Sequence, residues 1–401
     1  VTGVQTCALP IFANGEVEQG RITKSVLVID EAQDMDADEF SLIQALIRNN
    51  DDMRVIAVGD DDQNIYEFRG SDSAFMRQLI HDYGATRYEL VENYRSKANI
   101  VALANRFAEG IGNRMKQNPI EAVQRENGIV QIVRHTCNNM EEPIVRQIME
   151  NYRGGRACVL TGTNEDALCV LGLLLKNGIR AKLIQSLDGF RLYNLAEVRF
   201  FLHTIDKRLR TPVISNDLWN QAKQALEETY SDSACLENVR NMISDFEKVN
   251  SYSKYRSDLE EFIKESQFED FYTDDRETVF VSTIHKSKGR EFDSVWLLLN
   301  REQLCDDAGR RKLYVGMTRA KDNLYVHCNT GIFDAYEGAG IGRFVDTTQY
   351  PEPQELSLQL THRDVVLDFF KGKKEQILKL HSGAALSFGQ GFLFATLGGY
   401  P

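Results

Sequence analysis

The chain has 401 residues, of which 42% are hydrophobic and 26% are charged, a composition typical of a folded globular protein with two or three domains. Its formal net charge of -12 excludes a protein that is basic over its whole surface, so nucleic acid would need a local basic channel. Seven cysteines without CxxC spacing argue against a disulfide framework or a zinc site and favour the reducing cytoplasm. No run of about 18 or more apolar residues occurs, so we expect no membrane span.

Both ends of the chain have an arbitrary composition. The first residues, VTGVQTCALPI, lack the basic start, apolar middle and small-residue cleavage site of a signal peptide, so residues 1–12 are left out of the fold prediction. The last residues, ATLGGYP, have no tail-like pattern. We therefore expect the chain to be a fragment of a longer protein.

The first part of the chain alternates short apolar runs with helix-like stretches. The runs lie at residues 25–30, 54–60 and 87–93, and the helix-like stretches at 36–50 and 73–84. This alternation predicts βαβ units and a parallel sheet. A second set of apolar runs predicts a second α/β sheet, at residues 128–135, 156–163, 179–186, 277–284, 294–300 and 323–329.

The second sheet is interrupted by a stretch of different character. Residues 190–276 are charged and helix-like and contain no strand-like run, so we expect a helical insertion. After residue 331 a Gly-rich, Pro-bearing connector leads to a strand-like run at 355–360 and a helix-like stretch at 363–381. These residues predict the start of a small third module.

The motif VLVIDEAQD, at residues 26–34, places acids directly after an apolar strand. Parallel sheets bind ligands at the carboxyl ends of their strands, where Asp30 and Glu31 are expected. In nucleotide hydrolases such an Asp holds Mg²⁺, and a neighbouring acid orients or deprotonates the attacking water. Taken alone, the pattern is more often a strand that runs into a solvated turn.

The next strand-like run leads into VGDDDQNIYEFRGS, at residues 58–71. Gln63 is suited to contact a γ-phosphate or to hold water. Tyr66 and Phe68 are suited to stack on unpaired bases, and Arg69 to contact a phosphate. The alternative is a turn whose two aromatic rings fold into the core.

Two further motifs carry flat and cationic groups. In ENYRS, at residues 92–96, Tyr94 offers a face for a purine and Arg95 a fork for phosphate oxygens. In RRKLYVGMTRAK, at residues 310–321, Arg319 and Lys321 are expected at a helix start, where an arginine could stabilise charge on a transferring phosphoryl group. The alternatives are a structural triplet at a domain junction and a surface helix with ordinary cations.

The motif STIHKSKGREFD, at residues 282–293, is a polar and basic loop between two apolar strands. Lys286, Lys288 and Gly289 suit contacts to the phosphates of a nucleic acid or nucleotide. Glu291 could accept ribose hydroxyls. We expect His285 to be a hydrogen-bonding loop residue, since no metal-ligand spacing surrounds it.

Taken in chain order from Asp30 to Lys321, these five motifs closely resemble the UvrD/Rep-like superfamily 1 DNA helicases. The resemblance implies an α/β fold of RecA-like parallel sheets, one partial and one complete, with a helical insertion and a partial C-terminal accessory module. The implied domains are the C-terminal half of the first ATPase domain at 13–97, the second domain in two segments at 98–189 and 277–331, the insertion at 190–276, and the linker and truncated module at 332–401.

The resemblance also implies roles for the motif residues. Toward ATP, Asp30 would bind Mg²⁺, Glu31 would activate water, Gln63, Arg95 and Arg319 would contact the γ-phosphate, Tyr94 would stack on adenine, and Glu291 and Gly289 would help to hold the nucleotide. Toward single-stranded DNA, the implied residues are Tyr66, Phe68, Arg69, Lys286 and Lys288. Phe68 stands where relatives commonly have Trp, and Ala308 and Gly309 where they often have glutamates.

One family motif does not occur: the chain contains no GxxxxGK[ST] phosphate loop. We therefore predict a cytoplasmic fragment of an ATP-dependent DNA helicase or single-strand translocase, which separates strands or works on DNA junctions with repair or replication proteins. One alternative is a non-hydrolysing module that binds single-stranded DNA or a partner. Another is the motor part of a helicase–nuclease.

Overall fold

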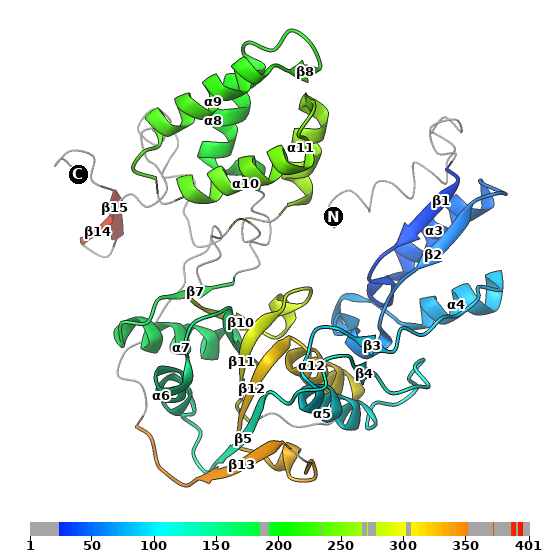
Figure 1. Ribbon diagram of the computed structural model, residues 1–401, viewed down its shortest axis with the longest axis vertical. Coiled ribbons are helices and arrows are strands. Elements are labelled where there is room, and N and C mark those ends of the chain that lie inside the picture. The colour runs from blue at the N-terminus through cyan, green and yellow to red at the C-terminus, as the bar shows by residue number, and fades with distance from the viewer. Residues whose placement is uncertain are drawn as a thin grey trace. The chain divides into compact units, whose positions relative to one another are not determined.

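The computed structural model describes residues 24–184, 192–233, 235–266, 271, 278–301, 306–338, 340–351, 372, 386–389 and 392–395. The chain forms two compact units (Figure 1). The sheet unit comprises residues 1–184 and 276–357, and the helical unit comprises residues 185–275 and 358–401. Among the described helices, none combines the length and apolar character needed to cross a membrane.

The larger sheet of the sheet unit has seven parallel strands in the described part of the chain, in the order β13-β5-β12-β11-β6-β10-β7. Strands β6 and β10 are buried at every position, as expected for a parallel sheet with both faces covered. The strands are β5 (Ile129–His135), β6 (Ala157–Thr161), β7 (Ala181–Leu183), β10 (Val279–Thr283), β11 (Phe292–Leu299), β12 (Ala320–Cys328) and β13 (Ile341–Asp346).

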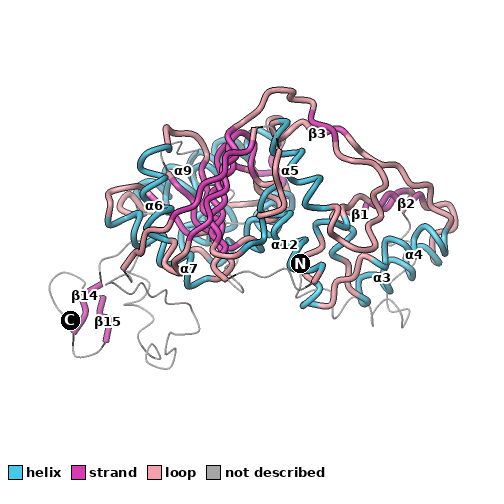
Figure 2. Tube along the Cα trace, turned by 90° about the horizontal axis from the view of Figure 1, so that it is seen from below, coloured by secondary structure: helices cyan, strands magenta, loops and turns pink. Residues whose placement is uncertain are grey.

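Helices cover both faces of this sheet. Figure 2 shows α6 (Glu141–Asn151) on one side, and α5 (Ala98–Ala108) and α12 (Asp307–Met317) on the other. Helices α6 and α7 (Asn164–Lys176) bury apolar side chains against the sheet, in a shared core that includes Trp296 of β11. The apolar runs predicted from the sequence thus form one tightly packed α/β layer structure.

The smaller sheet pairs β1 (Val26–Ile29) with β2 (Arg54–Ala57) in parallel. Helices α3 (Ala37–Arg48) and α4 (Ala74–Tyr83) contribute to a core with Ile29. A capping box starts α3, because Asp36 accepts from the backbone of Glu39 and the Glu39 carboxylate accepts from the backbone of Asp36.

The prediction of a third strand at 87–93 in this sheet is wrong. Only β3 (Glu92–Asn93) is a strand, and it pairs with β4 (Glu121–Ala122). Tyr88 and Leu90 are 83% and 84% exposed, so the alternating side chains have no core face to bury.

Strand β13 was missed because the sequence around it resembles a linker. It pairs in parallel with β5 at the edge of the sheet, and Phe344 and Val345 on it are 53% and 70% exposed. An edge strand of this kind does not need the continuous apolar run that marks the buried strands.

In the helical unit, four helices surround Phe201, Trp219 and Phe246. They are α8 (Ala196–Asp206), α9 (Asn216–Thr229), α10 (Leu236–Val249) and α11 (Arg256–Glu265). The expected lack of strands in this stretch needs a small correction, because β8 (Val213–Ile214) and β9 (Lys254–Tyr255) form a two-residue antiparallel pair that is too short to leave a sequence pattern.

A second antiparallel pair joins β14 (Leu386–Gly389) to β15 (Phe392–Ala395). The strand expected at 355–360 and the helix expected at 363–381 lie outside the described residues, apart from Gly372.

Candidate functional site

The loop after β1 carries the first two predicted residues. Asp30 is exposed, and its Oδ1 accepts a hydrogen bond of 2.9 Å from the backbone N–H of Glu31. Glu31 has φ 50° and ψ 41°, the left-handed conformation that costs a non-glycine residue about 1–3 kcal/mol. The chain therefore holds the Glu31 carboxylate in a direction that an ordinary strand end would not give it.

Gln33 fixes this acid to the neighbouring loop. Its side chain is buried, donates from Nε2 to Glu31 Oε2 at 2.5 Å, and accepts at Oε1 from the backbone N–H of Asp60 at 2.9 Å. A Cβ on Gly59 would lie 2.5 Å from Gln33 Oε1, so only glycine allows this approach. Gln33 was not predicted, although its place inside DEAQD could have suggested it.

The loop after β2 presents Gln63 at the end of a 3₁₀ turn, Asp61–Gln63. Asp60 caps the turn by accepting from the backbone of Asp62 at 3.0 Å. The other oxygen of Asp60 accepts from Gln63 Nε2 at 2.8 Å, and Gln63 Oε1 accepts from Arg319 Nη2 at 2.8 Å. Gln63 thus links the acidic loops to Arg319. Both residues are predicted from the sequence to contact the γ-phosphate.

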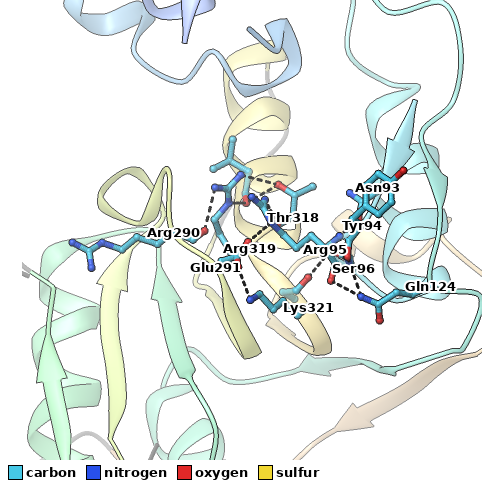
Figure 3. Close-up of polar contacts among 12 residues, drawn as sticks. Asn93, Tyr94, Arg95, Ser96, Gln124, Arg290, Glu291, Thr318, Arg319 and Lys321 are labelled. Atoms are coloured by element: carbon cyan, nitrogen blue, oxygen red, sulfur yellow. Dashed lines mark hydrogen bonds and ion pairs between the residues drawn. The ribbon is translucent and has the colours of Figure 1, made fainter. Parts of the chain in front are cut away.

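Arg319 lies at the C-terminal end of α12 and directly before β12, so its predicted place at a helix start is wrong. The residues before it already form α12, in which Leu313, Tyr314 and Met317 are buried. Arg319 donates to the backbone oxygens of Val315 and Arg290 at 3.1 and 3.2 Å (Figure 3).

Arg319 is only 2% exposed. Burial, together with the nearby positive charge of Arg95, lowers its pKa to about 10, so it remains charged at neutral pH. An arginine with this many fixed partners is positioned before any ligand arrives.

Arg95 and Lys321 both bind Glu291 (Figure 3). Arg95 Nε donates to Glu291 Oε2 at 2.8 Å, and Arg95 Nη1 donates to the Thr318 oxygen at 3.2 Å. The Lys321 hydrogen bond, followed by that of Arg95, lowers the pKa of Glu291. Glu291 therefore holds two cations beside Arg319.

Tyr94 is 68% exposed, and its hydroxyl donates to Glu92. The turn beneath it is fixed by Asn93, whose Oδ1 accepts from the backbone of Arg95 at 3.0 Å and of Ser96 at 2.8 Å. This arrangement leaves the ring of Tyr94 open to a flat ligand.

Lys288 lies among acids. Its side chain is 8% exposed and forms ion pairs with Asp34 and, at 3.3 Å, with Glu31. Burial raises the pKa of Asp34 despite this contact. Gly289 follows with φ 78°, a conformation that favours glycine, and Lys286 Nζ lies 3.0 Å from Asn164 Oδ1.

Tyr66, Phe68 and Arg69 form one patch, here called the aromatic patch. Tyr66 donates its hydroxyl to the His285 oxygen at 3.1 Å, and the Phe68 ring meets the His285 ring edge-on with centroids 5.6 Å apart. The Arg69 guanidinium lies 5.5 Å from both aromatic rings, and Phe68 is 69% exposed. Phe68 is therefore not folded into the core, as the alternative required, and Tyr66 is half-buried.

The contacts link most of the predicted residues into three groups. Glu31, Gln63 and Arg319 are connected through Gln33 and Asp60. The second group is formed by Arg95 and Glu291, and the third by the aromatic patch. Arg114 and Lys116, which bind the acids beside Gln63, were missed because the stretch NRMK that contains them has no recognisable chemical pattern.

Mg²⁺ fits this site only as part of a complex with phosphates. In the described residues no group of three or more His, Cys, Asp or Glu side chains could hold a metal ion. Proteins commonly bind Mg²⁺ through one or two carboxylates, with phosphates and water completing the shell. Exposed Asp30 suits that use.

The fold and the site define a parallel α/β protein whose carboxylates lie at strand ends, where such proteins bind ligands. The family model of the UvrD-like helicase C-terminal domain matches residues 88–212 and 209–331. That of the UvrD/REP helicase N-terminal domain matches residues 14–84. The chain therefore belongs to the UvrD-like helicase family.

Individual relatives are distant. YjcD of Bacillus subtilis is 24% identical over 402 residues, covering 78% of this chain and 52% of that protein. The ATP-dependent DNA helicase Rep of Buchnera aphidicola from Acyrthosiphon pisum is 22% identical over 402 residues, covering 75% of this chain and 62% of that protein. DNA helicase II of Escherichia coli is 36% identical over 90 residues, covering 22% of this chain and 12% of that protein. The chain thus spans about half to three fifths of the length of the first two relatives.

A solved structure, the C-terminal domain of a possible DNA helicase from Lactobacillus plantarum, matches with a TM-score of 0.32 and 14% identity, covering 63% of this chain and 98% of that chain. At this score the match adds nothing to the fold assignment, which rests on the sheets themselves.

Proposed function

We propose that the chain is the motor part of an ATP-dependent DNA helicase or single-strand translocase, which acts in the cytoplasm during DNA repair or replication. The observation that carries the proposal is the link from Glu31 through Gln33 and Asp60 to Gln63 and Arg319. It joins an acid, an amide and a buried arginine, which are among the groups that phosphoryl transfer to water uses. The family membership supports the same reaction.

In this proposal Glu31 accepts the proton of the attacking water, and Gln63 orients the γ-phosphate end of ATP. Arg319 and Arg95 stabilise the negative charge that develops on the transferred group. Asp30 would hold Mg²⁺, which when bound neutralises charge on the phosphates. Tyr94 supplies a face for adenine, and Glu291 keeps Arg95 beside Arg319 while Gly289 shapes the adjoining loop.

Lys288 defines what must change when the nucleotide binds. Its ion pair with Glu31 occupies the carboxylate that would act as the base. We therefore expect nucleotide binding to move Lys288 away from Glu31. Lys288 would keep its ion pair with Asp34.

The aromatic patch would bind single-stranded DNA. Stacking of a base on an aromatic side chain contributes about 1–3 kcal/mol, and Arg69 would add a phosphate contact. Lys286 and Lys288 lie on the loop beside His285, which contacts the patch. Glu67, inside the same segment, accepts from Arg311 of α12 at 2.5 Å, so the patch is tied to the helix that ends next to Arg319.

The experiment uses a complete protein that carries the GxxxxGK[ST] loop together with these residues. Glu31→Gln should still bind ATP and single-stranded DNA but lose at least about 100-fold in turnover, because the base is removed. Glu228→Gln, an exposed change in α9, is the control and should leave turnover unchanged. Full hydrolysis by Glu31→Gln would refute the assigned base, and a wild-type protein without DNA-stimulated hydrolysis would refute the motor.

ATP hydrolysis by the 401-residue chain alone provides a second test. Because it contains no GxxxxGK[ST] loop, we expect little or no ATP hydrolysis from it, with or without DNA. DNA-stimulated hydrolysis by this chain would contradict the mechanism.

A further inference from the structure

The acidic turn that presents Gln63 is held by two cations from a distant segment. Arg114, which lies 52 residues after Asp62, donates to both of its oxygens, from Nε at 2.8 Å and from Nη2 at 2.7 Å. Lys116 Nζ lies 2.6 Å from Asp60 Oδ1 and 3.1 Å from Asp62 Oδ2. Both cations belong to the connection between α5 and β4.

These ion pairs are buried. The side chain of Asp62 is 0% exposed, and those of Lys116 and Arg114 are 15% and 20% exposed. The acids Asp60 and Asp62 raise the pKa of Lys116 far above its ordinary value against the effect of burial, so it stays charged. Removing one partner from a buried pair leaves an uncompensated charge, so the remaining groups must move or take up a proton.

Asp60 passes this restraint to Gln63. One oxygen of Asp60 contacts Lys116, and the other accepts from Gln63 Nε2 at 2.8 Å. An ionised carboxylate can only accept, so the amide nitrogen of Gln63 must face Asp60 and its oxygen must face Arg319. A carboxamide turned over would place its N–H groups against the guanidinium.

We propose that Lys116 is a positioning residue: by fixing Asp60, it sets the orientation of the Gln63 carboxamide toward Arg319. The catalytic importance of this orientation rests on the proposed function. The orientation itself is a property of the 401-residue chain and can be measured without ATP.

The first test follows the side-chain amide of Gln63 by ¹⁵N–¹H NMR of the 401-residue chain, with the signal assigned through Gln63→Ala. In the wild type we expect a signal well separated from those of exposed glutamines. Lys116→Met keeps an unbranched side chain but removes the ammonium group, whose Nζ lies 5.5 Å from the centroid of the Tyr314 ring. The Gln63 signal should then move to the chemical shift of exposed glutamines. Lys97→Met is the matched control, because Lys97 is 20% exposed and also faces two carboxylates, and it should leave the signal in place.

A Gln63 signal that is unchanged in folded Lys116→Met would overturn the proposal. If that variant does not fold, Lys116→Gln keeps a hydrogen-bond donor without the charge and should displace the same signal. An unmoved signal in Lys116→Gln would have the same meaning.

The second test measures turnover by the complete protein. We expect Lys116→Met to lower kcat by about 10- to 100-fold with little change in KM, because binding is retained while a reacting group is misplaced. Lys116→Arg should recover most of this loss. A rise in KM for Lys116→Met with no change in kcat would argue against a positioning role. A wild-type protein without ATPase activity would refute the proposed function, while the NMR result would still decide the orientation.

Discussion

The β1–β2 sheet and the seven-stranded sheet contribute residues of opposite charge and different burial to the candidate site. Asp30 and Glu31 follow β1 and are exposed, whereas Arg319, directly before β12, is 2% exposed. The sheets differ in the same sense: Val28 of β1 is 62% exposed, and Leu298 of β11 is fully buried. The carboxylates stand where a ligand and water can reach them, while the arginine is fixed in advance by the more deeply packed sheet.

Replacing Arg319 would test this division most severely. Arg319→Lys keeps the charge but loses the planar fork that reaches Gln63 and two backbone oxygens. Arginines that stabilise phosphoryl transfer contribute about 1,000-fold or more to turnover, so we expect a loss of that order in DNA-stimulated ATP hydrolysis by the complete protein. Arg240→Lys, at an exposed pair with Glu227, is the control. A loss of turnover below about tenfold would show that Arg319 does not stabilise the transferred phosphoryl group.

Core substitutions compare the depth of the two sheets directly. Leu298→Ala should destabilise the 401-residue chain by about 3 kcal/mol, because it opens a cavity in the larger sheet. Val28→Ala should change the stability by no more than about 0.5 kcal/mol. Urea unfolding followed by Trp296 fluorescence, in a Trp219→Phe background, measures both. Equal destabilisation would mean that the β1–β2 face is covered rather than open.

A buried histidine pair gives the larger sheet a pH dependence. His327 of β12 and His135 of β5 stack and share a hydrogen bond of 2.9 Å, and burial lowers the pKa of His327 to about 3. The unfolded chain regains a pKa near 6.5 and binds a proton that the folded chain does not, so stability falls as the pH drops below about 6.5.

Between pH 7 and pH 5.5 we expect His327 to account for a loss of about 1 kcal/mol. The slope of unfolding free energy against pH should become shallower in His327→Gln and stay unchanged in His203→Gln, an exposed position in α8. An unchanged slope in His327→Gln would show that this side chain is already solvated in the folded state.

The smallest effect is expected at Glu291, which is 38% exposed. Its lowered pKa means that its ion pairs with Arg95 and Lys321 stabilise the fold above about pH 4.5 and lose this effect as the pH falls through the lowered value. Because solvent screens the pairs, Glu291→Gln should cost only about 0.5 kcal/mol at neutral pH, measured by the urea midpoint. Glu126→Gln, at a more exposed pair, is the control. A cost of several kcal/mol would place Glu291 in a drier environment.

Much of the larger sheet could be predicted because its central strands are buried on both faces and therefore form continuous apolar runs. The exceptions have local causes. Strand β13 has an exposed face and a Gly-rich neighbourhood, and the apolar residues at 87–93 meet no core. A pattern of side chains shows which face could be buried but does not show what is available to bury it.

In the candidate site, residues within a motif were easier to predict than the residues that hold them. Glu31 and Gln63 follow strand ends, where their chemistry is visible in the sequence. Lys116 acts on Asp60 from a segment that is remote along the chain, and an isolated cation in a loop gives no sign of its partner. The position of Arg319 was misjudged because a helix before it ends only where β12 begins.

The left-handed backbone of Glu31 implies that stability of the fold and the proposed catalytic role favour different residues at this position. Glycine accepts this conformation without the steric cost that a glutamate bears, so Glu31→Gly should relieve strain and, even after its own entropic penalty, leave the fold at least as robust. The same change would delete the proposed base. Selection for thermal resistance alone would therefore favour losing the residue, whereas selection for the proposed role of Glu31 in turnover would retain it.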